Sequence, residues 1–208
     1  FENYFYIITN TDNSKNYKLM KTSVKNTDYN NWINVIDHRK GVLIEGVDVF
    51  KNYLVVSERS NGLNRINIKK WDDSEDYYLD FNCETYSAYT TNNIDFNTNI
   101  LRYGFNSLTN PPCVIDFNME TKEKTIRKQQ QVLDPDFDKD NYISERIWSK
   151  SEDGTDVPIS LVYKKGLQKN SKNPLLLYGY GSYGNTIDPY FSISRLSLLN
   201  RGFVFAIA

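Results

Sequence analysis

The chain has 208 residues, enough for one large domain or two modest ones. Its 25 lysines and arginines balance its 26 aspartates and glutamates, so no excess of charge would draw nucleic acid or an anionic membrane to the whole surface. Tyrosine (16) and phenylalanine (11) are abundant, whereas glycine and proline are few, and this composition favours half-buried strands over disorder.

Strand-like runs recur about every 50 residues in the N-terminal part of the chain. The first runs of the three repeats are 4–9, 53–58 and 101–106, and the second runs, each after a polar turn, are 17–21, 63–68 and 113–117. A period near 50 with several short antiparallel strands per repeat is typical of propeller blades. We therefore predict that residues 1–131 form about two and a half blades of a β-propeller. A β-sandwich with a chance spacing is the alternative.

The pattern changes after Gln131, where an acidic stretch with few strand-forming residues follows. Such a stretch is typical of a solvated linker between domains. We expect a linker at 132–144 and a second domain at 145–208.

The second domain begins with a predicted β-hairpin. Its strands are 145–150 and 157–163, and Asp153-Gly154 occupies the turn. A further strand, 174–178, is apolar without alternation, as expected where a strand is covered on both faces.

A helix and a last strand complete the pattern. Ile193, Leu196 and Leu199 have helical spacing, and Gly202 provides a C-terminal stop. The apolar run 203–208 reads as a second buried strand. The order hairpin, strand, helix, strand predicts the opening of a layered α/β domain.

Gly179, Gly181 and Gly184 follow the predicted strand 174–178 in a G-x-G-x-x-G pattern. A dinucleotide site needs a helix that begins at these glycines, but residues 185–191 intervene. The alternative is the loop of an α/β-hydrolase that lines the active site and contributes to the oxyanion hole. Tyr180 and Tyr183 then either point toward a substrate or pack between the loop and the propeller.

Other chemistry-bearing residues are few. Cys83 and Cys113 are too far apart in sequence for a disulfide scaffold or a zinc site, so we expect reduced packing residues and no metal. The one histidine, His38, is expected in a surface turn rather than as a catalytic base. No apolar stretch approaches the roughly 20 residues that span a bilayer, so no membrane partner is expected.

Several blocks of the sequence resemble the oligopeptidase B branch of the prolyl oligopeptidase family of serine peptidases. The similarity runs over essentially the whole chain in the family's order. Its clearest blocks are Ser-Glu-Arg-Ser-Asn-Gly-Leu at 57–63, Ser-Glu-Arg-Ile-Trp at 144–148, Asn-Pro-Leu-Leu-Leu-Tyr-Gly-Tyr-Gly-Ser-Tyr-Gly at 173–184, Ser-Arg-Leu-Ser-Leu-Leu at 194–199 and Arg-Gly-Phe-Val-Phe-Ala at 201–206. The last two blocks are the specific ones.

The resemblance implies the last blades of a seven-bladed propeller that caps an α/β-hydrolase domain and admits only short peptides. It implies cleavage after arginine or lysine through an acyl-enzyme, without a cofactor, in the cytoplasm. The Ser, Asp and His of the triad lie downstream of the position that matches Ala208. The chain is then an internal fragment, inactive alone, whose partners are basic short peptides and the remainder of its own polypeptide.

The resemblance also assigns roles to three residues. Tyr180 matches a tyrosine that donates a hydrogen bond to the oxyanion, and Tyr183 matches an aromatic of the specificity pocket. Asp188 matches the first of two acidic residues that attract a basic side chain, although the second position here is Tyr190. Asp188 precedes Pro189, so shaping a turn is its alternative role. A noncatalytic remnant or interaction module from a split gene is the alternative for the whole chain.

Overall fold

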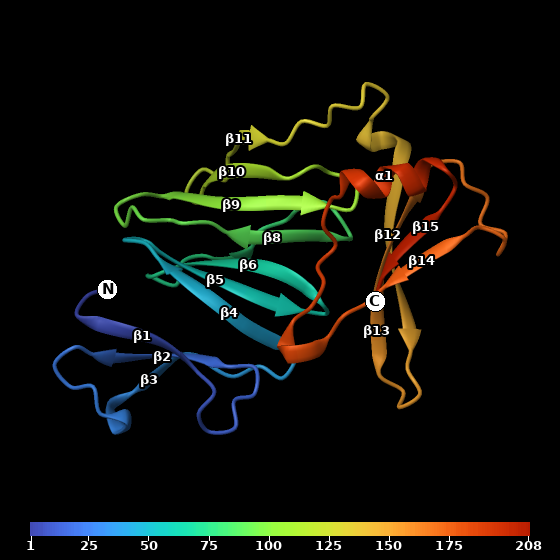
Figure 1. Cartoon of the computed structure of the whole chain (residues 1–208). Coiled ribbons are helices and arrows are strands. Elements are labelled where there is room, and N and C mark those ends of the chain that lie inside the picture. The colour runs from blue at the N-terminus through green and yellow to red at the C-terminus, as the bar shows by residue number, and fades with distance from the viewer. The chain divides into compact units, whose positions relative to one another are not determined.

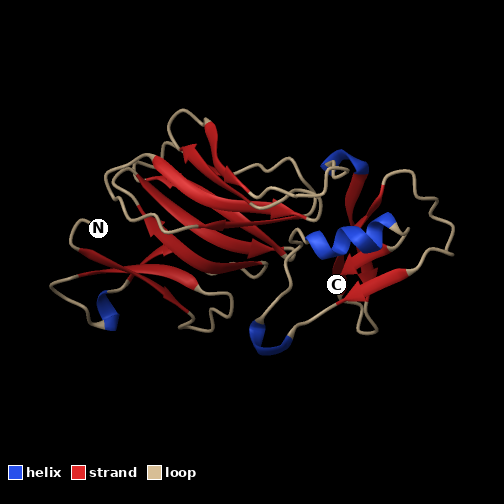
Figure 2. Ribbon diagram, turned by 45° about the horizontal axis from the view of Figure 1, so that its top comes forward, coloured by secondary structure: helices blue, strands red, loops and turns tan.

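The computed structural model describes all residues from Phe1 to Ala208, and strands dominate it (Figure 2). The chain forms two compact units. One comprises Phe1–Leu79, Tyr89–Arg102 and Phe117–Glu123, and the other comprises Asp80–Ala88, Tyr103–Asp116 and Lys124–Ala208. The predicted domain boundaries near residues 131 and 144 remain predictions.

Three sheets follow one another along the chain, and in each the strands pair in sequence order (Figure 1). The first contains β1 (Tyr4–Thr9), β2 (Lys18–Ser23) and β3 (Ile33–Ile36), the second β4 (Val42–Val49), β5 (Tyr53–Ser60), β6 (Leu63–Lys70) and β7 (Asp76–Tyr78), and the third β8 (Tyr86–Thr90), β9 (Ile100–Ser107), β10 (Cys113–Asn118) and β11 (Lys124–Gln129). The six predicted runs are confirmed as β1, β2, β5, β6, β9 and β10. The period near 50 therefore reflects equivalent strands of successive antiparallel sheets.

The turn between β5 and β6 illustrates how local sequence sets the register. Asn61 and Gly62 both adopt positive φ angles, of 52° and 74°, as a two-residue type I′ hairpin requires. Ser60 and Leu63 are paired directly on either side of this turn. Every later pair of the two strands, as far as Tyr53 with Lys70, keeps this register.

Some strands carry no clear sequence signal. In β4 the pairing with β5 shifts between Ile44 and Gly46, so the period of two is interrupted inside the strand. β11 is exposed throughout and rich in lysine and arginine, which is how many edge strands avoid pairing with other chains. Apolar alternation cannot reveal either strand.

Apolar side chains join the first sheet to the second within one compact unit. Leu19 of β2 packs with Ile44 of β4 and with Leu54 and Val56 of β5, and all four are buried. Burial of such side chains contributes about 1.5 to 3 kcal/mol each. Neighbouring sheets of this unit thus share one core.

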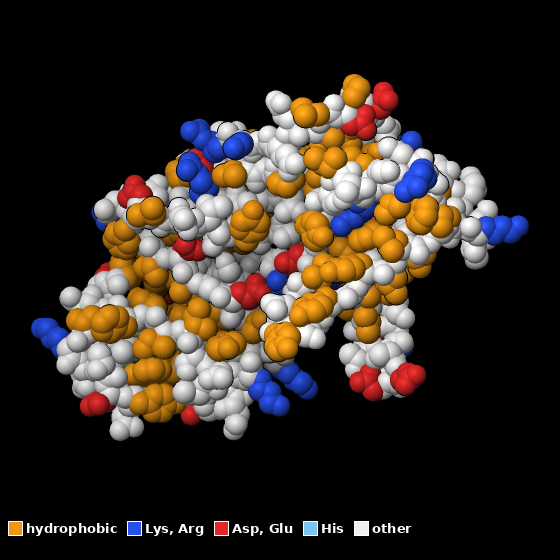
Figure 3. All heavy atoms as spheres, viewed as in Figure 1, with side chains coloured by type: hydrophobic (Ala, Val, Ile, Leu, Met, Phe, Trp, Pro, Cys, Tyr) orange, Lys and Arg blue, Asp and Glu red, His pale blue; other side chains and the backbone are white.

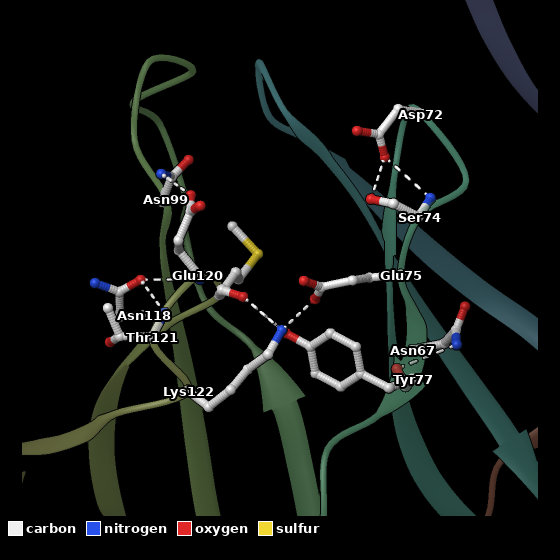
Figure 4. Close-up of polar contacts among 11 residues, drawn as sticks. Asn67, Asp72, Ser74, Glu75, Tyr77, Asn99, Asn118, Glu120, Thr121 and Lys122 are labelled. Carbon is white, nitrogen blue, oxygen red and sulfur yellow. Dashed lines mark hydrogen bonds and ion pairs between the residues drawn. The ribbon is translucent and has the colours of Figure 1, made fainter.

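Polar contacts around Lys122 join the second sheet to the turn between β10 and β11 (Figure 4). The ammonium group pairs with the carboxylate of Glu75, lies 3.8 Å from the centre of the Tyr77 ring and donates to the carbonyl oxygen of Met119 at 2.8 Å. The Tyr77 hydroxyl donates to the same carbonyl at 3.1 Å. One lysine therefore serves as a polar link between two sheets.

The fourth sheet is mixed, with the order β12-β13-β15-β14. Its strands are β12 (Tyr142–Lys150), β13 (Asp156–Lys164), β14 (Leu175–Tyr178) and β15 (Val204–Ile207). β12 and β13 form the predicted hairpin, and Gly154 in its turn has a φ angle of 83°. The Asp153 carboxylate accepts hydrogen bonds from Ser151 and Thr155, which lower its pKa to about 2. β14 and β15 are parallel.

The helix α1 (Ile193–Asn200) connects β14 to β15, and Gly202, with a φ angle of 86°, ends it as predicted. Gly202 N–H bonds to the Leu199 carbonyl at 3.0 Å and Phe203 N–H to the Leu198 carbonyl at 3.2 Å, which is a Schellman motif. The prediction of the apolar face of α1 is partly wrong. Leu199 is buried, but Ile193 is half exposed, and the charged Arg195 is buried in its stead.

Packing of the fourth sheet involves three other parts of its compact unit. Leu199 of α1 packs with Val162 and Phe205 of the sheet and with Leu108, which follows β9. Phe137, in the predicted linker, joins this core. No helix of the structure is long and apolar enough to span a membrane. Three single 3₁₀ turns complete the fold: η1 (Tyr29–Asn31), η2 (Lys139–Asn141) and η3 (Ser182–Gly184).

Candidate active-site loop

The glycine-rich loop begins where β14 and β15 both end. Val204 N–H bonds to the Pro174 carbonyl at 2.9 Å, and Ala208 N–H bonds to the Tyr178 carbonyl at 3.1 Å. Tyr178 is the last residue of β14, so the loop leaves the sheet at the carboxyl ends of two parallel strands. Open α/β sheets bind their ligands at this edge.

One position of this loop has a backbone conformation that favours glycine. At Gly179 a Cβ atom would lie 3.4 Å from the Ala208 carbonyl oxygen, which is an ordinary van der Waals contact, so the fold does not require glycine there. Gly184 has a φ angle of 70°, and Tyr183 before it has a φ angle of 58°. A left-handed tyrosine is unfavourable by roughly 1 to 2 kcal/mol, and such residues cluster at functional sites.

The two tyrosines of the loop are exposed. Tyr180 is 47% exposed, and Tyr183 is 95% exposed. The structure thus presents both phenols to solvent in one loop, which a substrate contact requires. The oxyanion role of Tyr180 and the pocket role of Tyr183 remain predictions.

Asp188 lies farther along the chain, in the extended segment that leads to α1. It is partly buried, the following Pro189 is buried, and the Asp188 carbonyl accepts a hydrogen bond from Tyr190 N–H at 2.9 Å. Two residues later, Phe191 N–H bonds to the buried amide oxygen of Asn106 at 3.0 Å. This anchor fixes the segment that carries Asp188, whose recognition role remains a prediction.

The sequence analysis missed a pocket of about 330 Å³ beside β14. Tyr178, Tyr190 and the buried Arg195 line it together with Leu176 and Phe205. The available signal was the spacing of Arg195 and Leu199, four residues apart on the helix and therefore on one face. Arginine is normally exposed, so a buried one was not expected from the sequence.

Other candidate sites are less developed. The helix after the glycines begins only at Ile193, so its N-terminus lies away from the G-x-G-x-x-G loop that a dinucleotide would need. No group of side chains is arranged to hold a metal ion. Cys83 and Cys113 are free thiols as expected, and His38 is exposed in a stretch without regular structure.

Comparison with known sequences assigns this fold to a class of enzymes. Residues 2–130 match the prolyl oligopeptidase N-terminal β-propeller domain. The chain belongs to the prolyl oligopeptidase family, whose members are serine peptidases. The three meandering sheets are therefore part of a β-propeller, as predicted.

Individual relatives extend the similarity over the fourth sheet. The dipeptidyl aminopeptidase BI of Pseudoxanthomonas mexicana is 38% identical over 97% of this chain, and protease 2 of Moraxella lacunata is 29% identical over 100% of it. Oligopeptidase B from Trypanosoma brucei, solved with covalently bound antipain, superposes with a TM-score of 0.88 at 31% identity over 99% of this chain. The matched region is 28 to 30% of the length of each of these relatives. The chain thus spans less than a third of the proteins it resembles.

Proposed function

We propose that the chain is the propeller-to-catalytic junction of a serine endopeptidase of the oligopeptidase B type. In this proposal the intact protein hydrolyses short peptides after arginine or lysine through an acyl-enzyme, in the cytoplasm. The propeller, with seven blades when complete, restricts access to the active site. The Ser, Asp and His of the triad lie outside this chain, which is inactive alone.

The fourth sheet and α1 are, in this proposal, the opening of an α/β-hydrolase domain. The parallel pair β14 and β15, joined through α1, supports this assignment, because helical crossovers between parallel strands characterise α/β folds. One observation carries the functional proposal. The loop with Tyr180 leaves the sheet at the carboxyl ends of this parallel pair, where such sheets place reactive groups.

Tyr180 is the oxyanion donor in the proposed mechanism. When the downstream serine attacks the scissile carbonyl, negative charge develops on its oxygen, and a preorganised phenol stabilises that charge by donating a hydrogen bond. Loss of one such donor reduces kcat by roughly 100- to 1000-fold. The exposure of Tyr180 in a loop at the carboxyl ends of β14 and β15 supports this role.

Substrate recognition is assigned to Tyr183 and Asp188. Tyr183 lines the pocket for the residue before the scissile bond, and Asp188 attracts a neighbouring basic side chain. Since Tyr190 stands where a second acidic residue would, one charge rather than two acts on the substrate. Asp188→Asn should then change discrimination for a basic neighbour by about 1 kcal/mol, because solvent screens a partly exposed charge.

The test is Tyr180→Phe in the intact protein, with Tyr89→Phe, at an exposed tyrosine of the propeller part, as the matched control. Tyr180→Phe should lower kcat on an arginine amide substrate by about 100- to 1000-fold with little change in KM, since the lost hydroxyl acts mainly in the transition state. Tyr89→Phe should keep the wild-type kcat. Steady-state kinetics of the wild type and the two variants measure kcat and KM, and their melting temperatures show whether all three are equally stable.

Wild-type kcat for Tyr180→Phe would make Tyr180 a packing residue. An intact protein without arginine-directed hydrolysis, or a reading frame without a Gly-x-Ser-x-Gly nucleophile elbow after Ala208, would favour the noncatalytic remnant.

A dipeptidyl aminopeptidase is the second candidate function, because the relative with that name is 38% identical to this chain. Such an enzyme needs a free substrate N-terminus two residues before the cleaved bond. Paired substrates that differ only in an acetyl group on that N-terminus distinguish the two functions. An endopeptidase cleaves both, whereas the dipeptidyl enzyme cleaves only the free one.

A further inference from the structure

Arg195 is a buried charge for which this chain supplies no counter-charge. Its side chain is among the buried polar groups, at 5% exposure. The guanidinium lies 4.0 Å from the centre of the Phe205 ring, and Nη1 donates to the Tyr190 carbonyl oxygen at 2.7 Å. No carboxylate forms an ion pair with it. Burial lowers the pKa of Arg195, which is what uncompensated desolvation does to a cation.

The pocket beside Arg195 contains a cation and no acidic side chain, so its chemistry suits an anion. Its volume is about 330 Å³, and its other polar groups include Ser192 and Ser194. No aspartate or glutamate lines it. A planar guanidinium accepts a carboxylate through two parallel hydrogen bonds.

The strand that borders this pocket has an open edge. Because the Pro174 and Tyr178 carbonyls bond to β15, the period of two places the main-chain groups of Leu175 and Leu177 on the opposite edge. β14 is the last strand of its sheet, so this edge has no partner. Figure 3 shows apolar side chains gathered over β14 and α1. An open edge with exposed apolar side chains is a surface that another segment covers.

We propose that the Arg195 pocket is a carboxylate-binding site, and that its occupant is an aspartate or glutamate side chain of the same polypeptide, from the part that follows Ala208. The relatives are more than three times as long as the matched region. Ala208 is hydrogen-bonded to Tyr178, a pocket residue, so the continuing chain leaves β15 beside the pocket.

A segment that covers β14 also closes the pocket, and this explains why the proposed occupant is a carboxylate. Leu176 and Tyr178 belong both to β14 and to the pocket, so a segment that covers β14 also removes water from Arg195. A buried cation without a counter-charge is strongly unfavourable, whereas a paired and hydrogen-bonded one is tolerated. The covering segment therefore brings the anion with it.

A double-mutant scan in the intact protein tests the proposal. Each aspartate and glutamate encoded after Ala208 is changed singly to its amide, in the wild type and in Arg195→Met, and unfolding is measured in urea. One amide substitution should lower the folded-to-unfolded ratio on the order of 100-fold in the wild type and only a few-fold in Arg195→Met.

Arg201→Met is the matched control, because Arg201 ends the same helix, is exposed and donates only to the Ser197 carbonyl at 3.1 Å. Every amide substitution should be additive with it. If Arg195→Met does not fold, Arg195→Gln replaces it, since glutamine removes the charge and keeps a hydrogen-bond donor for the Tyr190 carbonyl. The readout is stability, so the outcome does not depend on peptidase activity.

Two results would overturn the proposal. Additivity of every amide substitution with Arg195→Met would show that no carboxylate of the polypeptide pairs with Arg195. Saturable stabilisation of the wild type by formate, absent in Arg195→Met and not reproduced by chloride at equal ionic strength, would assign the pocket to a free anion instead.

Discussion

Two strands of this protein have the same kind of sequence and opposite surroundings. β5 contains the run Tyr53-Leu-Val-Val56, and β14 is Leu175-Leu-Leu-Tyr178. All four residues of the first run are buried. The four residues of the second are exposed by 58, 43, 59 and 46% in chain order. An uninterrupted apolar run therefore shows that a strand is suited to burial on both faces, and its neighbours decide whether it is buried.

The neighbours explain the difference. β5 lies between β4 and β6, and apolar side chains of β2 pack on it. β14 has one neighbour, β15. The propeller-type sheets thus take most of their burial from residues close in sequence, whereas β14 of the mixed sheet has an exposed face and an unpaired edge.

The largest expected effect tests this contrast directly. In the intact protein, Leu54→Ala should reduce the free energy of unfolding by roughly 2 to 5 kcal/mol, as for other buried leucines. If further polypeptide covers β14, Leu176→Ala should have an effect of similar size. Urea unfolding followed by fluorescence and circular dichroism measures both.

The same pair of variants can also show that β14 is not covered in the intact protein. A change below about 0.5 kcal/mol for Leu176→Ala would show that this side chain stays as exposed in the intact protein as it is here. Leu133→Ala is the control, because Leu133 is 90% exposed and is expected to give a change of that small size.

Much of the fold could be predicted from the sequence where local rules and tertiary burial agree. The repeat period located β1, β5 and β9, and Gly202 located the end of α1. β4 and β11 were missed because a bulge and full exposure remove the alternation on which strand prediction depends.

The candidate site was predictable only in part. The glycine spacing placed Tyr180 and Tyr183 in a loop after the strand 174–178, since glycines mark close approach and left-handed turns, but it left open whether the two side chains are exposed or packed. The burial of Arg195 in place of Ile193 could not be foreseen, because an amphipathic pattern assumes that charged residues face water. The proposed roles of Tyr180 and Tyr183 require a catalytic serine, which in the proposed function lies outside this chain.

The next prediction concerns a buried tyrosine of the propeller-type sheets. Tyr103 of β9 is buried beside Phe81, with ring centres 5.9 Å apart, and burial raises its pKa to about 12. The pKa in the unfolded chain is about 10. Tyr103 therefore contributes stability that is complete below pH 10 and is lost as the pH rises toward 12.

Tyr103→Phe should remove this part of the alkaline sensitivity. At pH 11 the expected difference from the wild type is about 1 kcal/mol in the free energy of unfolding, relative to the difference at pH 8. Unfolding in urea at both pH values measures it, and Tyr89→Phe, at an exposed tyrosine, is the control. An alkaline loss as large in Tyr103→Phe as in the wild type would mean that Tyr103 titrates freely in the folded protein.

The smallest expected effect concerns the polar link between sheets. Lys122→Met removes the ammonium group, and with it the ion pair with Glu75, the contact with the Tyr77 ring and the hydrogen bond to the Met119 carbonyl. Both charged side chains are more than a third exposed, so the unfolding free energy should fall by only about 0.5 kcal/mol. Because salt screens exposed ion pairs, the difference between wild type and variant should shrink between 0.05 and about 0.5 M sodium chloride.

Lys124→Met is the control, since Lys124 donates to the Asp80 carbonyl at 2.7 Å and forms no ion pair in the structure. A loss above about 2 kcal/mol that salt does not reduce would show that the link is desolvated in the intact protein, and that the propeller-type sheets do not take their burial from this chain alone.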